Sequence, residues 1–159
     1  MNAYVRIAAH CLVVVSLLVF LTAPGLADPS SPAVEEKRGP VAVPTADTEY
    51  NRGVRARVTK DWKAAESAFR NAVTLRPAFA DAWNELGYAL RNQGRYPESL
   101  KAYDEALRLR PNFPEALEYL GEAYVKMGRL EDARRILVRL HALDTQRAQE
   151  LAEVIDKGK

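Results

Sequence analysis

Cysteine and histidine are the scarcest reactive residues in this chain of 159 residues, which contains one cysteine, Cys11, and two histidines, His10 and His141. A single cysteine forms no disulfide within the chain, so packing alone must hold the fold together. The sequence also lacks a glycine-rich phosphate loop, an HExxH pair and a calcium-binding loop. Its carboxylates lie among other charged residues rather than in apolar surroundings that would raise their pKa values. These absences predict a protein that is not an enzyme and that binds no metal or cofactor.

A large excess of one charge is absent too, since 23 basic residues stand against 21 acidic ones. Removing residues 1–27 would take away Arg6 and no acid, which leaves 22 basic residues against 21 acidic ones. A strongly basic surface supplies most of the non-specific affinity of proteins for nucleic acid. The composition therefore predicts no nucleic-acid partner.

The longest apolar run extends from Cys11 to Leu21 and is interrupted only by Ser16. Arg6 precedes this run, and the small residues Gly25 and Ala27 follow it. This order is typical of a secretory signal peptide, so we predict that residues 1–27 are a signal cleaved after Ala27. The run is shorter than the roughly 20 residues of a membrane-spanning helix, and an uncleaved membrane anchor is the alternative. Cleavage implies an exported protein without a stable membrane span, periplasmic in a Gram-negative bacterium and secreted otherwise.

Residues 28–45 contain four prolines and show no helical periodicity. Such a composition favours a flexible or polyproline-like linker. We therefore expect the folded part of the chain to begin near residue 46.

From that point the sequence repeats with a period of 34 residues, in the segments 46–79, 80–113 and 114–147. The third segment keeps the glycine column with Gly121 and shares Leu120, Ala123, Gly128 and Arg129 with the second. The first two segments share ten identical residues, which are Ala46/Ala80, Asp47/Asp81, Gly53/Gly87, Arg57/Arg91, Ala68/Ala102, Ala72/Ala106, Leu75/Leu109, Arg76/Arg110, Pro77/Pro111 and Phe79/Phe113.

Two sets of glycines have different expected roles in each segment. Gly53, Gly87 and Gly121 fall in the middle of predicted helices, where glycine costs about 1 kcal/mol relative to alanine. A cost repeated three times suggests that the missing side chain allows a neighbouring helix to come close. Gly94 and Gly128 fall at the turn, where a left-handed conformation ends a helix, whereas the first segment has Lys60-Asp61 there and a weaker stop.

Apolar residues recur with helical spacing in every segment, and no stretch alternates as a strand would. In the second segment Trp83, Leu86, Gly87 and Leu90 form one stripe. With Ser99, Tyr103, Ala106 and Pro111 they resemble the tetratricopeptide repeat, a helix–turn–helix unit of 34 residues. The first segment departs from this pattern at Glu49 and Arg52, where large apolar groups are expected. Polar residues suit an end unit because it has no predecessor to pack against.

The resemblance implies an all-α fold, an α-solenoid of three repeats. A stripe of Ala148, Leu151, Ala152 and Ile155 predicts a further capping helix and tail over residues 148–159.

In the resembled family the first helices of the repeats line a concave groove that binds proteins or peptides. The implied binding residues here are Tyr50, Val54, Arg57, Asp81, Asn84, Tyr88, Arg91, Glu118 and Glu122, flanked by Asp47, Glu115 and Lys126. The acids near the third repeat favour a partner with basic character. An alternative for the charged residues is interaction with the helix dipoles, and an alternative for the tyrosines is packing on neighbouring side chains.

Some domains of this family hold a C-terminal carboxylate with lysine, asparagine and arginine. The matching positions here are Tyr50, Val54, Glu85, Glu115 and Tyr119, which supply no cation or amide. The sequence therefore predicts an exported protein-binding adaptor or scaffold of a different specificity. The alternative is a structural or self-associating component of a cell-envelope assembly, and the oligomeric state is left open.

Overall fold

Residues 43–158 are the part of the chain that the computed structural model describes. The predicted signal peptide and most of the predicted linker lie outside these residues. Within them the chain forms no strand and seven helices, which are α1 (Ala46–Val58), α2 (Trp62–Leu75), α3 (Ala80–Asn92), α4 (Tyr96–Leu109), α5 (Pro114–Lys126), α6 (Leu130–His141) and α7 (Thr145–Lys157).

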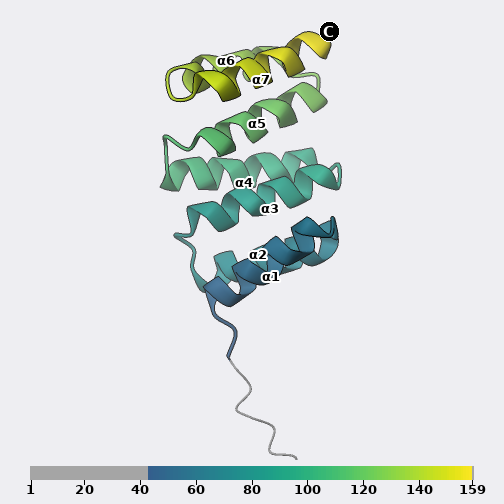
Figure 1. Cartoon of the computed structure of the whole chain (residues 1–159), viewed down its shortest axis with the longest axis vertical. Helices are drawn as coiled ribbons and strands as arrows, with labels where there is room; N and C mark the ends of the chain where they lie inside the picture. Colours follow the sequence, from purple (N-terminus) through teal and green to yellow (C-terminus); the bar gives the residue numbers. More distant parts are fainter. Residues whose placement is uncertain (1–42, 159) are drawn as a thin grey trace, which may run out of the picture. The chain divides into compact units, whose positions relative to one another are not determined.

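The helices are stacked in chain order, and each repeat is one helix pair (Figure 1). The pairs are α1 with α2, α3 with α4, and α5 with α6, and α7 packs against both α6 and α5. The predicted all-α solenoid is therefore confirmed. The last helix begins three residues before the predicted boundary at residue 148, because the Asp144 side chain accepts a hydrogen bond from the Arg147 backbone N–H and caps the helix at Thr145.

The mid-helix glycines allow close packing, as their repetition predicted. A Cβ atom at Gly53 would lie 2.6 Å from the Phe69 ring of α2, and one at Gly87 would lie 2.5 Å from the Tyr103 ring of α4. Gly121 differs, because its Cβ would meet Leu151 of α7 at 2.5 Å rather than a residue of its own partner helix. Helix α7 therefore packs directly against α5 at Gly121.

The turns within the repeats use the left-handed conformation. Gly94 and Gly128 have φ angles of 74° and 71°, and Lys60 takes the same region with φ 58°. A residue with a Cβ atom is strained in this region and glycine is not. The first repeat therefore makes the same turn as the others at a higher conformational cost.

Two clusters of buried side chains form the core. One contains Phe69 and Leu90, the other contains Tyr103 and Leu117, and Trp83 packs against both. Because each cluster draws on helices of adjacent repeats, no repeat buries its apolar stripe alone.

The first repeat ends the stack with a polar contact in place of an apolar one. Glu49 is only 8% exposed, and its carboxylate accepts hydrogen bonds from Arg52 at 2.5 Å and from Asn71 at 2.9 Å. These hydrogen bonds hold the pKa of Glu49 below its ordinary value. The end unit is therefore closed by a buried, paired carboxylate.

Candidate functional site

The predicted binding residues lie on one face of α1, α3 and α5, which we call the first-helix face. Successive residues of a helix are rotated by about 100°, so Asp81, Asn84 and Tyr88 project from one side of α3. Leu86 and Leu90 project from the opposite side. Figure 1 shows the first helices of the repeats on the same side of the stack, which brings these faces together.

The acids at the start of this face are already paired within their own repeats. Asp47 forms a two-pronged ion pair with Arg76, and Asp81 forms the equivalent pair with Arg110 at 3.0 and 2.7 Å. The Arg110 guanidinium also lies over the Phe113 ring, 4.2 Å from its centroid, as Arg76 does over Phe79 at 4.7 Å. Asp81 thus joins the two ends of its repeat, which gives it a structural role beyond that expected from the helix dipole.

The acids of the third repeat are covered from within the chain as well. Arg147 of α7 bonds to Glu118 and lies 3.0 Å from Glu115, while Glu122 is paired with Arg91. Glu118 is buried, and burial raises its pKa although Arg147 opposes the shift. Arg147 is shared between Glu115, Glu118 and Asp144, so these acids are paired within the chain but outnumber their arginine, and a partner with basic character near them stays a prediction.

The centre of the face is a cluster of aromatic rings and arginines, which we call the aromatic–arginine cluster and which consists of Trp62, Tyr88, Tyr119, Arg57 and Arg91. The Tyr88 ring lies 5.8 Å from the Trp62 ring and 5.0 Å from the Tyr119 ring, measured between centroids. Arg91 lies over both tyrosines at 5.2 and 5.1 Å, and Arg57 lies 5.9 Å from the Tyr88 centroid. All five side chains are half-buried. Such contacts hold the rings in place while leaving part of each one accessible.

The sequence identified three of these five residues, Arg57, Tyr88 and Arg91. Tyr119 lies on the first helix of its repeat but one residue beyond the chosen column, which contains Glu118. Trp62 was missed because it begins the second helix of the first repeat, and only the fold brings it to Tyr88. Lys126 lies one residue beyond the 34-residue register of Arg57 and Arg91, where Val125 stands.

Charged and polar groups lie buried beneath the cluster. Arg57 Nε is 3.2 Å from Glu85 Oε2, and burial raises the pKa of Glu85 although Arg57 opposes the shift. Asn84 is 4% exposed, and its Oδ1 atom has no hydrogen-bond partner. The structure thus places Asn84 under the surface rather than on it.

Tyr50 and Val54, at the end of the face, pack mainly on the core. The Tyr50 ring lies 5.7 Å from the Phe69 ring and 4.9 Å from the Phe79 ring. Val54 is half-buried against the same cluster. Tyr50 therefore follows the alternative that the sequence left open, packing on its neighbours.

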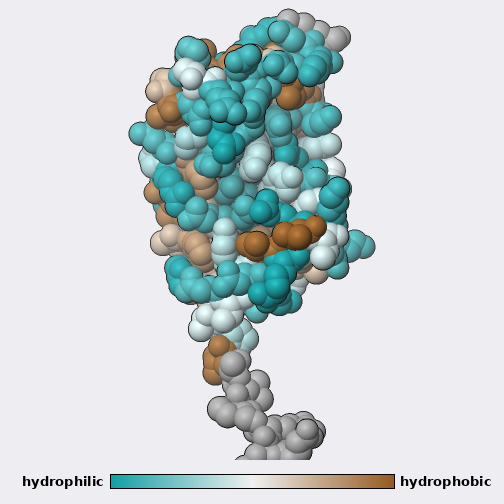
Figure 2. All heavy atoms as spheres, viewed as in Figure 1, coloured by the Kyte–Doolittle hydropathy of each residue, from teal (hydrophilic) through white to brown (hydrophobic). Residues whose placement is uncertain are grey.

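In the view of Figure 2 the face is mostly hydrophilic, with one larger hydrophobic patch at the level of α1 and α3. Val54 and the exposed Val58 belong to α1. The face therefore combines ion-paired side chains with a small apolar area.

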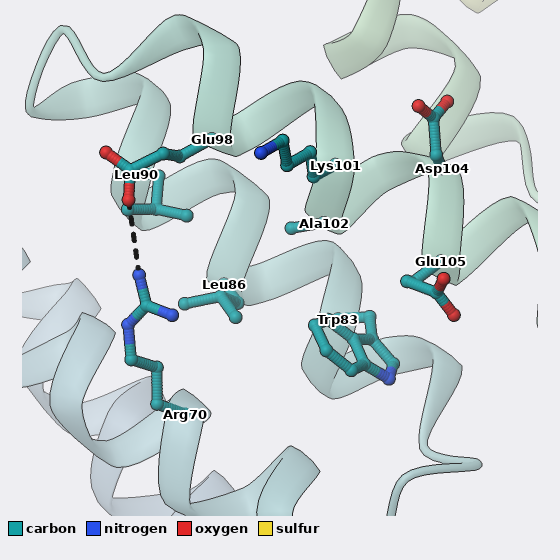
Figure 3. Close-up of a pocket in the computed structure, with 9 residues that line it drawn as sticks. All are labelled: Arg70, Trp83, Leu86, Leu90, Glu98, Lys101, Ala102, Asp104 and Glu105. Carbon is teal, nitrogen blue, oxygen red and sulfur yellow. Dashed lines mark ion pairs between the residues drawn. The ribbon is translucent and has the colours of Figure 1, made fainter.

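A second concave feature, which the sequence did not predict, lies between α2 and α4 on the other side of α3 (Figure 3). This cleft has a volume of about 520 Å³. Arg70 and Glu98 form an ion pair of 3.5 Å at one end, and Asp104 and Glu105 lie at the other. The apolar floor of the cleft is formed by Trp83, Leu86, Leu90 and Ala102. Its charged rim is formed by Arg70, Glu98, Lys101, Asp104 and Glu105.

Neither a metal centre nor a membrane helix is found in residues 43–158. No three or more histidine, cysteine, aspartate or glutamate side chains of this region come together in a way that could hold a metal ion. None of its helices is long and apolar enough to cross a membrane.

Comparison with known proteins bears on the repeats. Residues 87–128 match a family model described as TPR repeat, and residues 68–101 match one described as tetratricopeptide repeat. No curated protein sequence matches the chain.

Several solved structures have the same fold at low sequence identity. The TPR2B domain of yeast Sti1, in complex with pHsp70, is 20% identical with a TM-score of 0.67, and the match covers 71% of this chain and 94% of that one. The Arabidopsis OM64 TPR domain is 17% identical with a TM-score of 0.68, and the match covers 72% and 97%. The first TPR domain of Spaghetti (RPAP3), bound to the HSP90 peptide SRMEEVD, is 15% identical with a TM-score of 0.65, covering 71% and 94%. The chain thus carries sequence similar to tetratricopeptide repeats at residues 68–128 and has the all-α fold of tetratricopeptide domains.

Proposed function

We propose that this protein is an exported, non-catalytic adaptor that holds a protein or peptide segment on its first-helix face. The aromatic–arginine cluster is the observation that carries the proposal. Tyrosine, tryptophan and arginine are the residue types enriched at the energetic centres of protein interfaces. Rings already held by their neighbours lose little conformational freedom when a partner binds. The peptide complexes of Sti1 and Spaghetti support such a role for a fold of this kind.

The charges of the face limit the chemistry of the partner. Asp81, Glu118 and Glu122 are each paired with an arginine of the chain, and Arg57 and Arg91 are paired with acids. A charged partner would have to compete with these internal pairs. We therefore infer that the bound segment is uncharged where it contacts the cluster and presents aromatic, aliphatic or proline side chains to Tyr88 and Tyr119.

A capture experiment tests the role of the cluster. Residues 28–159 serve as the bait for envelope extract, because residues 43–158 contain both core clusters and all seven helices. The wild type should retain a partner that the Tyr88→Ala bait loses. Tyr124→Ala is the matched control, since it removes a half-buried tyrosine whose ring lies under Arg129 and not among the residues of the cluster. Retention by all three baits, with unchanged helical circular dichroism, would contradict the proposal.

A defined peptide tests the inferred specificity. Tyr50, Val54 and Glu85 stand where carboxylate-binding relatives of this fold place cations and amides, so the peptide SRMEEVD should not bind at concentrations up to about 1 mM. Titration calorimetry with residues 28–159 measures this. Saturable binding would show that the face accepts a terminal carboxylate after all.

Export rests on residues 1–27 alone. If the signal is cleaved as proposed, the N-terminal sequence of the protein isolated from the envelope or medium begins at Asp28. An intact Met1 on membrane-bound protein would favour the uncleaved anchor. Self-association, the other role that the sequence left open, concerns a different surface and is compatible with an adaptor.

A further inference from the structure

The two ends of the helix stack differ in polarity. At the end formed by α1 and α2, a small hollow of about 240 Å³ is lined in part by Glu49 and Asn71, which are hydrogen-bonded to each other. At the end formed by α6 and α7, the hollow has a volume of about 540 Å³ and is lined by residues without formal charge, which are Leu137, Val138, His141, Thr145, Ala148, Gln149 and Ala152. More than a quarter of the chain is charged, at 28%, so a hollow of this size without a charged lining residue is unusual here.

Exposed apolar side chains accompany the larger hollow. Val138 is 75% exposed on α6, and Leu143 is 41% exposed in the turn that leads to α7. In the repeats, the first helix is followed by a second helix that covers it, but no eighth helix covers α7 in the described residues. The end face formed by α6 and α7 therefore exposes apolar area that the other repeats bury.

We propose that this end face is a homodimer interface, in which two copies of the chain meet through a two-fold axis. Val138 is a projecting apolar side chain beside an apolar hollow, so a two-fold axis can place the Val138 of each copy in the hollow of the other. The linings of two copies can meet without placing like charges together, because none of the lining residues carries a formal charge.

The charges that flank the hollow are complementary under the same symmetry. Arg134 lies one turn before Val138 on α6, and Glu153 lies one turn after Gln149 on α7. Within one copy Arg134 is paired with Glu131, and Glu153 lies 3.6 Å from Lys157, so the edge of each helix carries both signs of charge. When α6 of one copy faces α7 of the other, Arg134 can meet Glu153 and Glu131 can meet Lys157, so the ion pairs within each copy are exchanged for pairs between the copies.

The two-fold arrangement also sets the limit of assembly. Stacking head to tail would place the uncharged hollow against the end where Glu49 and Arg52 form their ion pair, and would desolvate both charges. A two-fold contact buries no charged end and closes after two copies. Two helices of 12 and 13 residues present a face roughly 20 Å square. This is about half of the roughly 800 Å² that each partner buries in a stable specific interface, so we expect a weak, transient dimer with a Kd of about 1–100 µM.

Sedimentation equilibrium of residues 28–159 between about 1 and 300 µM tests the proposal. The mass should rise from one copy to two and stop there. Val138→Asp should weaken association by about 100-fold, because the substitution occurs twice in a two-fold interface. Val58→Asp is the matched control, since Val58 is 73% exposed at the opposite end of the stack, and it should leave the Kd unchanged.

The charged edges provide a second test that does not depend on the hollow. Arg134→Glu and Glu153→Arg should each weaken the dimer, and the double variant should restore it, which would show that α6 of one copy meets α7 of the other. A single-copy mass at every concentration would overturn the proposal and assign the hollow to another protein or to residues 28–42. Growth beyond two copies, or loss of association in Val58→Asp, would overturn it in favour of head-to-tail stacking. Tyr88→Ala should not change the dimer, so this result is separate from that of the adaptor proposal.

Discussion

The first and second repeats are built on the same 34-residue plan, but only the second has a repeat on both sides. Positions that act inside a repeat are the same in both, such as Asp81, Arg110 and Phe113 and their counterparts Asp47, Arg76 and Phe79. Positions that face the preceding repeat differ. Trp83 joins the two core clusters, whereas Glu49 occupies the same position at the end of the stack and is held by Arg52 and Asn71. Whether such a position is apolar therefore depends on the presence of a preceding repeat, and not on the 34-residue pattern itself.

The largest expected effect comes from the contact that both repeats share. Gly87→Ala should lower the free energy of unfolding by about 3 kcal/mol, because the new Cβ would lie 2.5 Å from the fully buried Tyr103 ring. Gly53→Ala makes the same collision with Phe69, but it should mainly unfold the terminal repeat and leave the others folded. Urea unfolding measures the first effect, and hydrogen exchange resolved by helix measures the second.

A compensating substitution distinguishes collision from lost helix propensity. Tyr103→Leu in the Gly87→Ala background should recover part of the lost stability, since a smaller side chain makes room for the Cβ. If the double variant instead loses the sum of the stabilities lost by Gly87→Ala and Tyr103→Leu alone, the contact with the Tyr103 ring is not the cause of the Gly87→Ala effect.

The next largest effect on stability is expected from the aromatic rings that pack against these glycines, Tyr103 against Gly87 and Phe69 against Gly53. Tyr103 is fully buried and its hydroxyl has no hydrogen-bond partner, whereas the first repeat has Phe69 at this position. Tyr103→Phe should stabilise the protein by about 1 kcal/mol, and Phe69→Tyr should destabilise it by about 1–2 kcal/mol. Thermal unfolding of the two variants should therefore move in opposite directions. A loss of stability in Tyr103→Phe would reveal an ordered water on the hydroxyl.

The polar end of the first repeat should make its stability depend on pH. The pKa of Glu49 is lowered in the folded state, so its contribution is present above the unfolded value of about 4.3 and is lost as the pH falls below it. Glu49→Gln should remove this contribution, about 1 kcal/mol at pH 7. Urea unfolding at pH 7 and pH 3.5 should show a smaller difference for the variant than for the wild type. Equal differences would mean that other carboxylates carry the acid sensitivity.

The smallest effect is expected at the turn within the first repeat. Lys60→Gly should stabilise the protein by about 0.5–1 kcal/mol, because glycine adopts the observed φ of 58° without strain. Gly94→Ala provides the reverse exchange in the second repeat, where a Cβ would meet no atom within 4 Å, and it should destabilise by a similar amount. Since space is not limiting at Gly94, any loss there measures the backbone conformation alone. A neutral result at both positions would remove the reason for the glycines in this column.

Much of the fold could be predicted from sequence patterns that involve only residues close together in the chain. The 34-residue period, the mid-helix glycines and the turn glycines are local signals, and the structure confirms the helix pairs and the close contacts they predict. Helical spacing also places Asp81, Asn84 and Tyr88 on one face of α3, because the rotation per residue is set by the backbone. These features need no knowledge of distant neighbours.

Which of those side chains remain available depends on partners far along the chain. Arg147 reaches Glu118 across 29 residues and Glu115 across 32, and Trp62 comes to Tyr88 from the helix after the first turn. Whether a carboxylate is free, paired or buried follows from how the helices pack and how much water the packing removes. The sequence therefore placed acids and tyrosines on one face without identifying their partners, whereas the packing of α7 and of the repeats pairs these acids with arginines around an aromatic–arginine cluster.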